Sequence, residues 1–368
     1  MKLLVLSAST GGGHDMRAFA LSHWWKIKGG ESQVYHPLET TFKGYKVGCE
    51  LYNIIQKKIP RFHHLYFHFL ELTSLHRNPL KIIGSKKFTD RCRLFNPDLI
   101  VSTHAHLNHG YFQLAKANLP KKIAFAAYCG ELADGVGFSK HWVNPKNDLF
   151  ISPYKEGAEA AQNRGMPVAK TLIGGPLLRE EFYKEWVEDN RSNVLKKYDL
   201  VASKPIFLLG TGANGFNRHH EVIQAICNAG IECQIVALCG TNQKTYQRLN
   251  KISSTKVVQI KPLPKVGAST MVELLHLSSW ILARPGAGLT TEAIVTGCPI
   301  IFDLSGGCMP QERNNLNFWE LRTGSLLSSS SPAELVKIIR SGTPIPRLKI
   351  PLESYPHVLL DGLFKLIR

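Results

Sequence analysis

Short apolar runs recur along the chain and alternate with longer stretches in which apolar residues follow a helical period. Such an alternation of strand-like and helical segments is typical of parallel sheets that are flanked by helices. We therefore predict an α/β protein. The strand-like runs occupy residues 3–9, 98–104, 122–129, 148–153, 205–211, 233–240, 256–262, 279–286 and 299–304.

The alternation occurs twice, and each time it opens with a strand that ends in a glycine-rich turn, SASTGGGHD at 7–15 and LLGTGANGF at 208–216. The 368 residues also exceed the size at which a single core stops growing. We predict two Rossmann-like, doubly wound domains with a ligand between the carboxyl ends of their sheets. The predicted domains are 1–175 and 176–350, with a hinge at 173–181 and a last helical segment, 351–368, that packs back toward the first domain.

Hydrophobic residues make up 44% of the chain, so it is globular. The eight cysteines include no CxxC pair, which favours a reducing cytosol over a zinc or disulfide framework. No stretch approaches the roughly 18 apolar residues of a transmembrane helix. The formal net charge of +17 predicts an anionic partner: nucleic acid, an acidic membrane surface or a phosphorylated ligand.

Residues 43–95 combine many basic side chains with aromatic and aliphatic ones and have a helical period without a strand signal. One interpretation is a pair of surface helices that pack on the first sheet. The other is a basic surface that lies on anionic lipid headgroups and admits an apolar substrate. No recognised nucleic-acid-binding motif accompanies the charge, so we do not expect nucleic acid as a partner.

The segment 284–312 reads as a phosphate-binding helix start followed by a polar loop. Gly286 and Gly288 let the backbone approach a ligand, and the helix that begins near Leu289 favours an anion at its first turn. Glu292 lies about one turn further, where a carboxylate can bond ribose hydroxyls. The loop that follows supplies hydrogen-bonding side chains: Gln311, Glu312, Asn314 and Asn315. The alternative is that the segment is an ordinary packing turn followed by a solvated loop.

The first glycine turn, TGGGH, leads into a helix that we expect to start near Asp15. It is not a dinucleotide or ATP fingerprint. His14 at the positive helix end is expected to point into the interdomain cleft and to stay neutral at pH 7, as a general base must. A lone histidine is more often structural, and that reading stays open.

A rival signal is HxHxxH after a strand, formed by His104, His106 and His109, which is similar to the ligand run of metallo-β-lactamase-like hydrolases. Those enzymes usually have aspartate before the last histidine, where this chain has Asn108. No convincing second ligand set follows, and no DxD occurs in the chain. We therefore predict no metal site and keep a metal-dependent hydrolase as the less favoured alternative.

Both glycine turns and the segment 284–312 resemble, in their order, the GT-B glycosyltransferases of family 28: the monogalactosyldiacylglycerol synthases, the processive diacylglycerol glucosyltransferases and, more remotely, MurG. The resemblance spans nearly the whole chain. Its main carriers are SASTGGGHDMRAFA, FNPDLIVSTHAHLNH, KHWVNPKNDLFISPYKEGAEAAQNRG, IGGPLLRE, LLGTGANG, LCGTNQKTYQRL and RPGAGLTTEAIVTGCPII with MPQERNN.

The resemblance implies a metal-independent, inverting hexosyltransferase that moves a sugar from UDP to a lipid hydroxyl, diacylglycerol first, to give a β-glycolipid. A MurG-like transfer to a polyprenyl-linked acceptor is the alternative. The UDP-sugar is the donor substrate and no further cofactor is implied. The place of action would be the cytoplasmic face of a membrane, with the protein bound peripherally. Neither the sugar nor the oligomeric state follows from the sequence.

The resemblance also implies residue roles. His14 would be the base, Glu131 would be a second catalytic residue that supplies a carboxylate, and the acceptor loop would be formed by Gly11, Gly12 and Gly13. The implied donor-binding residues are Thr211, Gly212, Met271, Gly286, Gly288, Leu289, Glu292, Gln311, Glu312 and Asn315.

The chain departs from the family pattern in two places. Gly130-Glu131 stands where relatives commonly have Thr-Asp, and about four extra residues follow within 132–140. CGTN at 239–242 replaces CGRN, which removes an arginine near the nucleotide. We expect the first departure to alter how a carboxylate reaches the acceptor and the second to alter donor affinity or choice.

Overall fold

The computed structural model describes residues 1–10, 12–58, 68, 71, 76–211, 217–252, 254–352 and 356–368. The chain forms two compact units. The first comprises Met1–Glu180, Met309–Asn314 and Leu352–Arg368, and the second comprises Glu181–Cys308 and Asn315–Pro351.

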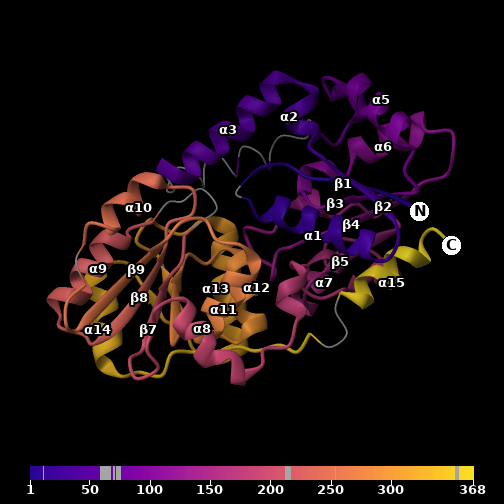
Figure 1. The fold of residues 1–368 in the computed structure, drawn as a ribbon. Helices are drawn as coiled ribbons and strands as arrows, with labels where there is room; N and C mark the ends of the chain where they lie inside the picture. Colours follow the sequence, from indigo (N-terminus) through magenta and orange to yellow (C-terminus); the bar gives the residue numbers. More distant parts are fainter. Residues whose placement is uncertain are drawn as a thin grey trace. The chain divides into compact units, whose positions relative to one another are not determined.

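The first unit is built on a six-stranded sheet in the order β2-β1-β3-β4-β5-β6, in which every neighbouring pair is parallel. Helices cover both faces of the sheet (Figure 1). The strands are β1 (Lys2–Leu6), β2 (Glu31–Tyr35), β3 (Leu99–Ser102), β4 (Ala124–Tyr128), β5 (Leu149–Ser152) and β6 (Thr171–Ile173). The helices are α1 (Gly13–Ile27), α2 (Pro37–Thr41), α3 (Lys43–Lys58), α5 (Ser85–Phe95), α6 (Gly110–Asn118), α7 (Lys155–Gln162) and α15 (His357–Lys365).

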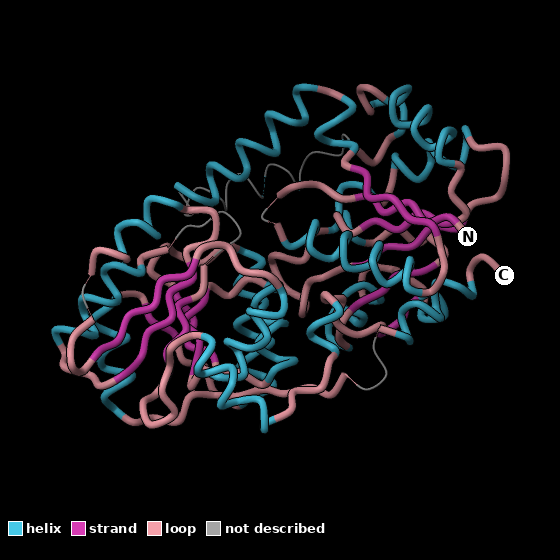
Figure 2. Tube along the Cα trace, in the orientation of Figure 1, coloured by secondary structure: helices cyan, strands magenta, loops and turns pink. Residues whose placement is uncertain are grey.

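The second unit repeats this plan with the order β12-β11-β10-β7-β8-β9, again all parallel. Figure 2 shows its strands as a separate magenta layer with cyan helices on both faces. The strands are β7 (Ile206–Leu209), β8 (Cys233–Leu238), β9 (Val258–Leu263), β10 (Trp280–Ala283), β11 (Ile300–Asp303) and β12 (Ser328–Ser329). The helices are α8 (Arg191–Lys197), α9 (His219–Asn228), α10 (Gln243–Leu249), α11 (Ala268–Leu277), α12 (Ala287–Thr296), α13 (Pro310–Thr323), which starts in residues of the first unit, and α14 (Pro332–Ser341).

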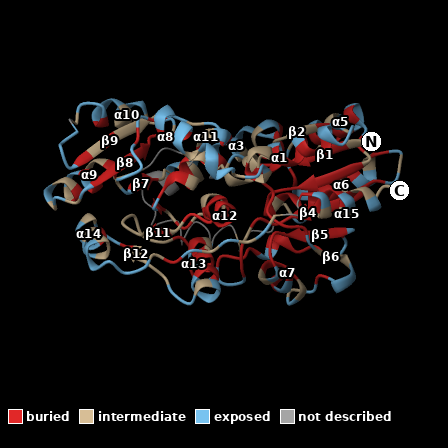
Figure 3. Cartoon of the chain, turned by 60° about the horizontal axis from the view of Figure 1, so that its bottom comes forward, coloured by how far each residue is buried: buried red, intermediate tan, exposed pale blue. Residues whose placement is uncertain are grey.

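Each sheet is buried on both faces because helices cover it on both sides. The burial pattern of β1, β3, β4 and β5 is almost continuous, and Figure 3 draws β1, β4 and β5 in red. Continuous burial explains why these strands are apolar runs without polar alternation. The α/β prediction with parallel, doubly wound sheets is therefore confirmed, and each predicted strand is present.

Three strands lie outside the predicted runs, and all of them are short or polar. Strand β2 has the sequence ESQVY and lies at one edge of its sheet, so it is only partly buried. Strands β6 and β12 are the edge strands at the other end of the first sheet and at one end of the second. An edge strand is not forced to be apolar, and so the apolar pattern misses it.

The last helix, α15, belongs to the first unit. The rings of Trp25 on α1 and Phe364 stack with their centroids 4.4 Å apart. Gly362 lies so close to Leu172 of β6 that a Cβ atom there would be 2.5 Å from the leucine Cδ2. These contacts seat α15 against α1 and against the edge strand β6.

The segment 43–95 is helical where it is described, as α3 and α5. Residues 59–67, 69–70 and 72–75 of the predicted basic surface lie outside the described residues. Among the described residues, no helix combines the length and the apolar content that crossing a membrane requires.

Candidate active site

Three neighbouring strands of the first sheet, β1, β3 and β4, each run into a loop that carries a predicted functional residue. In a parallel sheet the carboxyl ends of all strands meet at one edge. The loop after β1 leads to His14, the loop after β3 contains His104, and the loop after β4 contains Glu131. The topology therefore places these three residues at one edge of the sheet.

His14 lies in the first turn of α1, which begins at Gly13, two residues before the predicted start. The turn is made possible by Gly12, whose φ of 81° is a left-handed conformation that glycine adopts without strain. The Nδ1 atom of His14 lies 2.7 Å from the carbonyl oxygen of Thr103. A carbonyl can only accept a hydrogen bond, so Nδ1 carries the hydrogen and Nε2 keeps its lone pair.

The pKa of His14 is lowered from 6.5 to about 4, first because the ring is desolvated and second because the Arg17 guanidinium lies nearby. The hydrogen bond to Thr103 and the charge of Asp15 act in the opposite direction but do not compensate. The imidazole is therefore neutral at pH 7. Burial and a neighbouring cation are the main causes of the low pKa, and not the positive helix end that the sequence suggests.

Asp15, the next residue, fixes the start of α1. Its carboxylate accepts hydrogen bonds from Ser7 Oγ at 2.6 Å and Ser9 Oγ at 2.7 Å, and it pairs with His36 Nε2 at 2.9 Å. Burial alone would raise the pKa of Asp15, but these three partners hold it at about 2. The carboxylate stays ionised at every physiological pH and anchors the helix that carries His14.

Glu131 lies in the loop after β4, and its pKa is raised from 4.5 to about 7. Desolvation causes the rise, while the positive charge of Arg17 and a hydrogen bond with the Trp142 side chain limit it. The Trp142 ring also lies near His14, with 6.0 Å between the ring centroids. The side chain of Trp142 thus lies between two predicted site residues: it bonds Glu131, and its ring lies near that of His14.

The three histidines after β3 form part of a buried cluster of rings. His104 lies 4.6 Å from His14 between ring centroids, and its Nε2 is 3.1 Å from Thr10 Oγ1, while its Nδ1 accepts from the amide of His106. Burial and the neighbouring histidines keep the pKa of His104 and of His106 well below 6.5. Within the described part of the chain, no three histidine, cysteine or acidic side chains are grouped so that they would hold a metal ion.

The second unit presents an analogous edge, because β7 and β10 are paired neighbours. Strand β7 runs into Gly210 and Thr211, and β10 runs into the turn before α12. The amide of Gly210 donates to the carbonyl oxygen of Leu282 at 2.8 Å, which holds both turns side by side. Thr211 and the start of α12 therefore share one edge of the sheet.

The start of α12 leaves room for a ligand. Its N-cap residue, Gly286, has no side chain to cap the helix, and nothing in the described residues lies within 4 Å of where its Cβ would be. The amides of Gly288 and Leu289 are among the first-turn donors that a helix cannot satisfy internally. Open space in front of unsatisfied amides is what a phosphate group needs.

Two more predicted donor-binding residues, Glu292 and Met271, lie on the helices α12 and α11. Glu292 is on α12, one turn after Gly288, and it is 8% exposed. Met271 is in the first half of α11, a helix that contacts α12, and it is 6% exposed. Both side chains lie mainly inside the protein.

The first two turns of α13 carry Gln311, Glu312 and Asn315. Glu312 accepts from the amide of Met309 at 2.8 Å and so caps its own helix. Asn315 Nδ2 donates to the carbonyl oxygen of Pro285 at 2.7 Å and ties α13 to the turn before α12. Three side-chain atoms here are buried without a hydrogen-bond partner among the described residues: Gln311 Oε1, Asn314 Nδ2 and Asn315 Oδ1.

No protein-family model matches the chain. It is 24% identical to a processive diacylglycerol β-glucosyltransferase of Bacillus pumilus over 336 residues, which cover 87% of this chain and 81% of the relative. It is 22% identical to the chloroplastic monogalactosyldiacylglycerol synthase of Spinacia oleracea, with 100% of this chain and 71% of the relative covered. These relatives confirm the group that the sequence motifs resemble.

Two solved structures share the fold over 100% of this chain at 12% identity. Arabidopsis thaliana UGT89C1, in complex with UDP-L-rhamnose, superposes with a TM-score of 0.56 over 93% of its own chain. Acinetobacter baumannii MurG superposes with a TM-score of 0.55 over 94% of its own chain. The chain has the GT-B fold.

Two predicted glycines, Gly11 in the acceptor loop and Gly212 in the donor turn of the GT-B fold, lie outside the described residues. Gly13 is described, and a Cβ there would lie 3.4 Å from Arg17 Nη1. Arg17 and Trp142, which are not among the residues predicted from the sequence, lie beside predicted site residues. Arg17 follows His14 by three positions, so helical spacing alone places it on the same side of α1.

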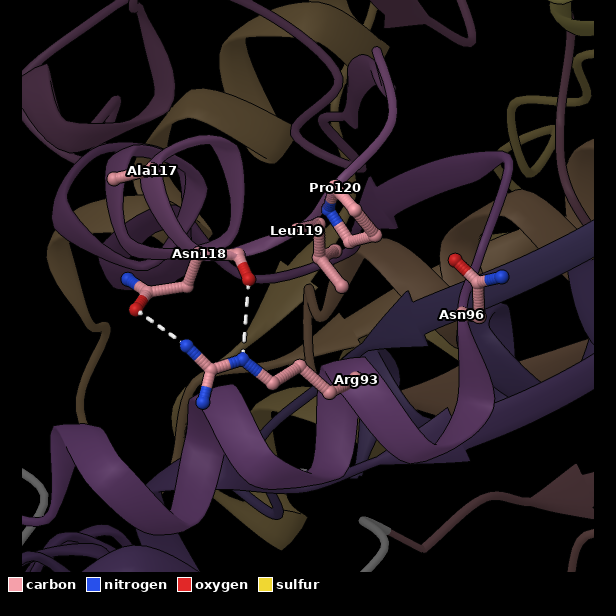
Figure 4. Close-up of a pocket in the computed structure, with 6 residues that line it drawn as sticks. All are labelled: Arg93, Asn96, Ala117, Asn118, Leu119 and Pro120. Carbon is pink, nitrogen blue, oxygen red and sulfur yellow. Dashed lines mark hydrogen bonds between the residues drawn. The ribbon is translucent and has the colours of Figure 1, made fainter.

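A shallow hollow in the first GT-B unit lies away from this edge (Figure 4). It is formed where α5 and α6 end, next to the residues that precede β3 and β4. Its one cationic side chain, Arg93, already donates from Nε and Nη2 to the carbonyl and side-chain oxygens of Asn118, both at 3.1 Å. The hollow is at the amino ends of the strands and carries none of the predicted chemistry.

Proposed function

We propose that this protein transfers a hexose from a UDP-sugar to the hydroxyl of a lipid acceptor, diacylglycerol first, with inversion at the anomeric carbon and without a metal ion. The observation that carries the proposal is His14: a neutral imidazole whose Nδ1 is bound to the Thr103 carbonyl, which leaves Nε2 as a proton acceptor. The named activity of the sequence relatives, the diacylglycerol glycosyltransferases, supports the lipid acceptor.

The reaction is a single displacement. The acceptor oxygen attacks the anomeric carbon, its proton passes to His14 Nε2, and the bond to the UDP oxygen breaks on the opposite face. One inversion converts an α-linked donor into a β-glycoside. The base contributes a factor of about 100 to 10,000 to the rate.

The charge that develops on the leaving diphosphate needs donors that are already in place. The first-turn amides of α12, in front of the open space at Gly286, supply such donors in this proposal. Glu292 would bind the ribose. The unpaired polar atoms of Gln311, Asn314 and Asn315 support a sugar contact, since leaving each of them unsatisfied costs about 1–3 kcal/mol.

We further propose that the protein works on the cytoplasmic face of a membrane. On α3, Val47, Leu51 and Ile54 are exposed by 59%, 45% and 51%, and their spacing places them on one side of the helix. Lysines at 43 and 46 lie on the same helix. An apolar stripe with flanking lysines suits an anionic lipid surface.

The test is glycolipid formation on liposomes that contain diacylglycerol, with labelled UDP-glucose, UDP-galactose and UDP-N-acetylglucosamine in parallel. We expect a β-linked product that still forms in the presence of EDTA. The His14→Gln variant should lose at least about 100-fold in turnover but keep its affinity for UDP. His23→Gln is the matched control, because His23 is an exposed residue of the same helix. Near-normal turnover by His14→Gln would reject the base assignment, and a product only with polyprenyl-linked acceptors would select the MurG-like alternative.

A further inference from the structure

Arg17 is a buried cation on α1, one helical turn after His14. Its side chain is only 8% exposed, and its Nη2 atom donates to the carbonyl oxygen of Gly130 at 3.0 Å. Burial of a guanidinium is costly unless its charge interacts with the groups around it. The position of Arg17 therefore calls for a specific reason.

Gly130 shows that the protein is built around this guanidinium. A Cβ atom on Gly130 would lie 2.1 Å from Arg17 Cζ and 2.3 Å from Arg17 Nε. Gly130 is absent from the glycines with a positive φ, so its backbone does not require glycine. The missing side chain is needed for space, because the Arg17 head group occupies the place where a Cβ would be.

The same guanidinium acts on both His14 and Glu131. It is the second cause, after desolvation, of the low pKa of His14, and it opposes the desolvation that raises the pKa of Glu131. Asp15 acts on His14 in the opposite sense, and the Trp142 side chain bonds Glu131. Arg17 is thus the charge common to both groups.

We propose that Arg17 is a positioning residue for His14 and Glu131: one helical turn after His14 and held against Gly130, its guanidinium joins the helix that carries the imidazole to the loop that carries the carboxyl group. Its role in turnover rests on the proposed glycosyl transfer. Its effect on the charge of these two groups does not, and can be measured without substrate.

Two substitutions remove the guanidinium from its place by different routes. Arg17→Met deletes the charge but keeps much of the volume of the side chain. Gly130→Ala leaves the charge in the chain but drives the head group out of contact with residue 130, because the new methyl group occupies its space. Arg91→Met is the matched control: Arg91 is a partly buried arginine of the same unit that bonds Gln33 and takes no part in the site.

The substrate-free readout is an NMR titration of ¹⁵N-histidine-labelled protein, in which the His14→Gln spectrum identifies the His14 signal. We expect the pKa of His14 to rise by roughly one unit in Arg17→Met and to rise in Gly130→Ala, with no change in Arg91→Met. The double variant should match Arg17→Met, since both substitutions remove one interaction. The acid limb of kcat/KM should move to higher pH by a similar amount, so that the activity at pH 4 relative to pH 7 falls about fivefold.

Additive effects of the two substitutions, or an unchanged His14 titration in both single variants, would overturn the proposal. A uniform loss of turnover at every pH with an unmoved acid limb would do the same, because it would show a purely structural role. If the wild-type protein makes no glycolipid, the proposed function fails, whereas the NMR comparison still decides the role of Arg17.

Discussion

The buried carboxyl group of Glu131 should make the free energy of unfolding depend on pH, because Arg17 and Trp142 compensate only part of the effect of burial on its pKa. The unfolded chain releases the proton of Glu131 near pH 4.5, whereas the folded protein holds it until about pH 7. Between these values the folded state binds more protons than the unfolded state, so this group lowers the free energy of unfolding as the pH rises. Glu131→Gln removes the titration and keeps an oxygen that can accept from Trp142.

The magnitude follows from the two pKa values. Linkage gives a destabilisation by Glu131 of about 1.4 kcal/mol at pH 5.5 and about 3 kcal/mol at pH 8, both relative to a group that does not titrate. The stabilisation of the protein by Glu131→Gln should therefore grow by roughly 2 kcal/mol over this interval.

The assay must report on the first unit alone, because two-unit proteins need not unfold in one step. Amide hydrogen exchange of β4 and β5, measured at pH 5.5 and pH 8 in both proteins, gives the free energy of opening of that sheet. A stabilisation that is the same at both pH values would mean that charge is not its cause. A destabilisation that grows with pH would mean that Arg17 outweighs burial and that Glu131 is an ion-paired carboxylate.

Two further predictions concern the second unit. His219 is 3% exposed, its Nε2 atom is hydrogen-bonded to the Leu238 carbonyl oxygen, and burial lowers its pKa to about 4. The neutral ring therefore contributes to the free energy of unfolding in full above pH 6.5, and this contribution, on the order of 3 kcal/mol, is lost as the pH falls toward 4. His219→Gln should flatten the pH dependence of opening of β7 and β8 in hydrogen exchange, and an unchanged slope would contradict the assignment. Gly286→Ala should leave the thermal midpoint of unfolding within about 2 °C, since position 286 has open space and an ordinary φ of −76°. The same substitution should weaken UDP binding, measured by calorimetry, by about tenfold or more. An unaltered affinity would show that the start of α12 does not belong to the donor site.

The sequence predicted the parallel strands well because their physical requirement is simple. A strand that is covered on both faces must be apolar throughout, and β3 and β10 are such strands. The edge strand β2, with the sequence ESQVY, has no such requirement and was missed. A run of apolar residues therefore predicts a strand that is covered on both faces, but it does not predict a strand at the edge of a sheet.

The site was predictable to the extent that it lies in local motifs. His14 follows three glycines, and the turn before α12 has the glycines that an anion-binding helix start needs. Arg17 meets Gly130 across 113 positions of sequence, and no local pattern joins them. The Gly130-Glu131 departure from the family pattern has a reason only once the Arg17 head group is seen in the space of a side chain.

The path of the chain through the two units has a consequence for biosynthesis. The first unit contains Met1–Glu180 but also Leu352–Arg368, which include α15 with its stacked Phe364. A ribosome makes residues 352–368 only after it has made the entire second unit. The sheet and the helix α1 with His14 thus emerge first, and the surface that receives α15 stays uncovered until the second unit has been made. Trp25 therefore lacks its stacking partner Phe364 until the last residues of the first unit have been made.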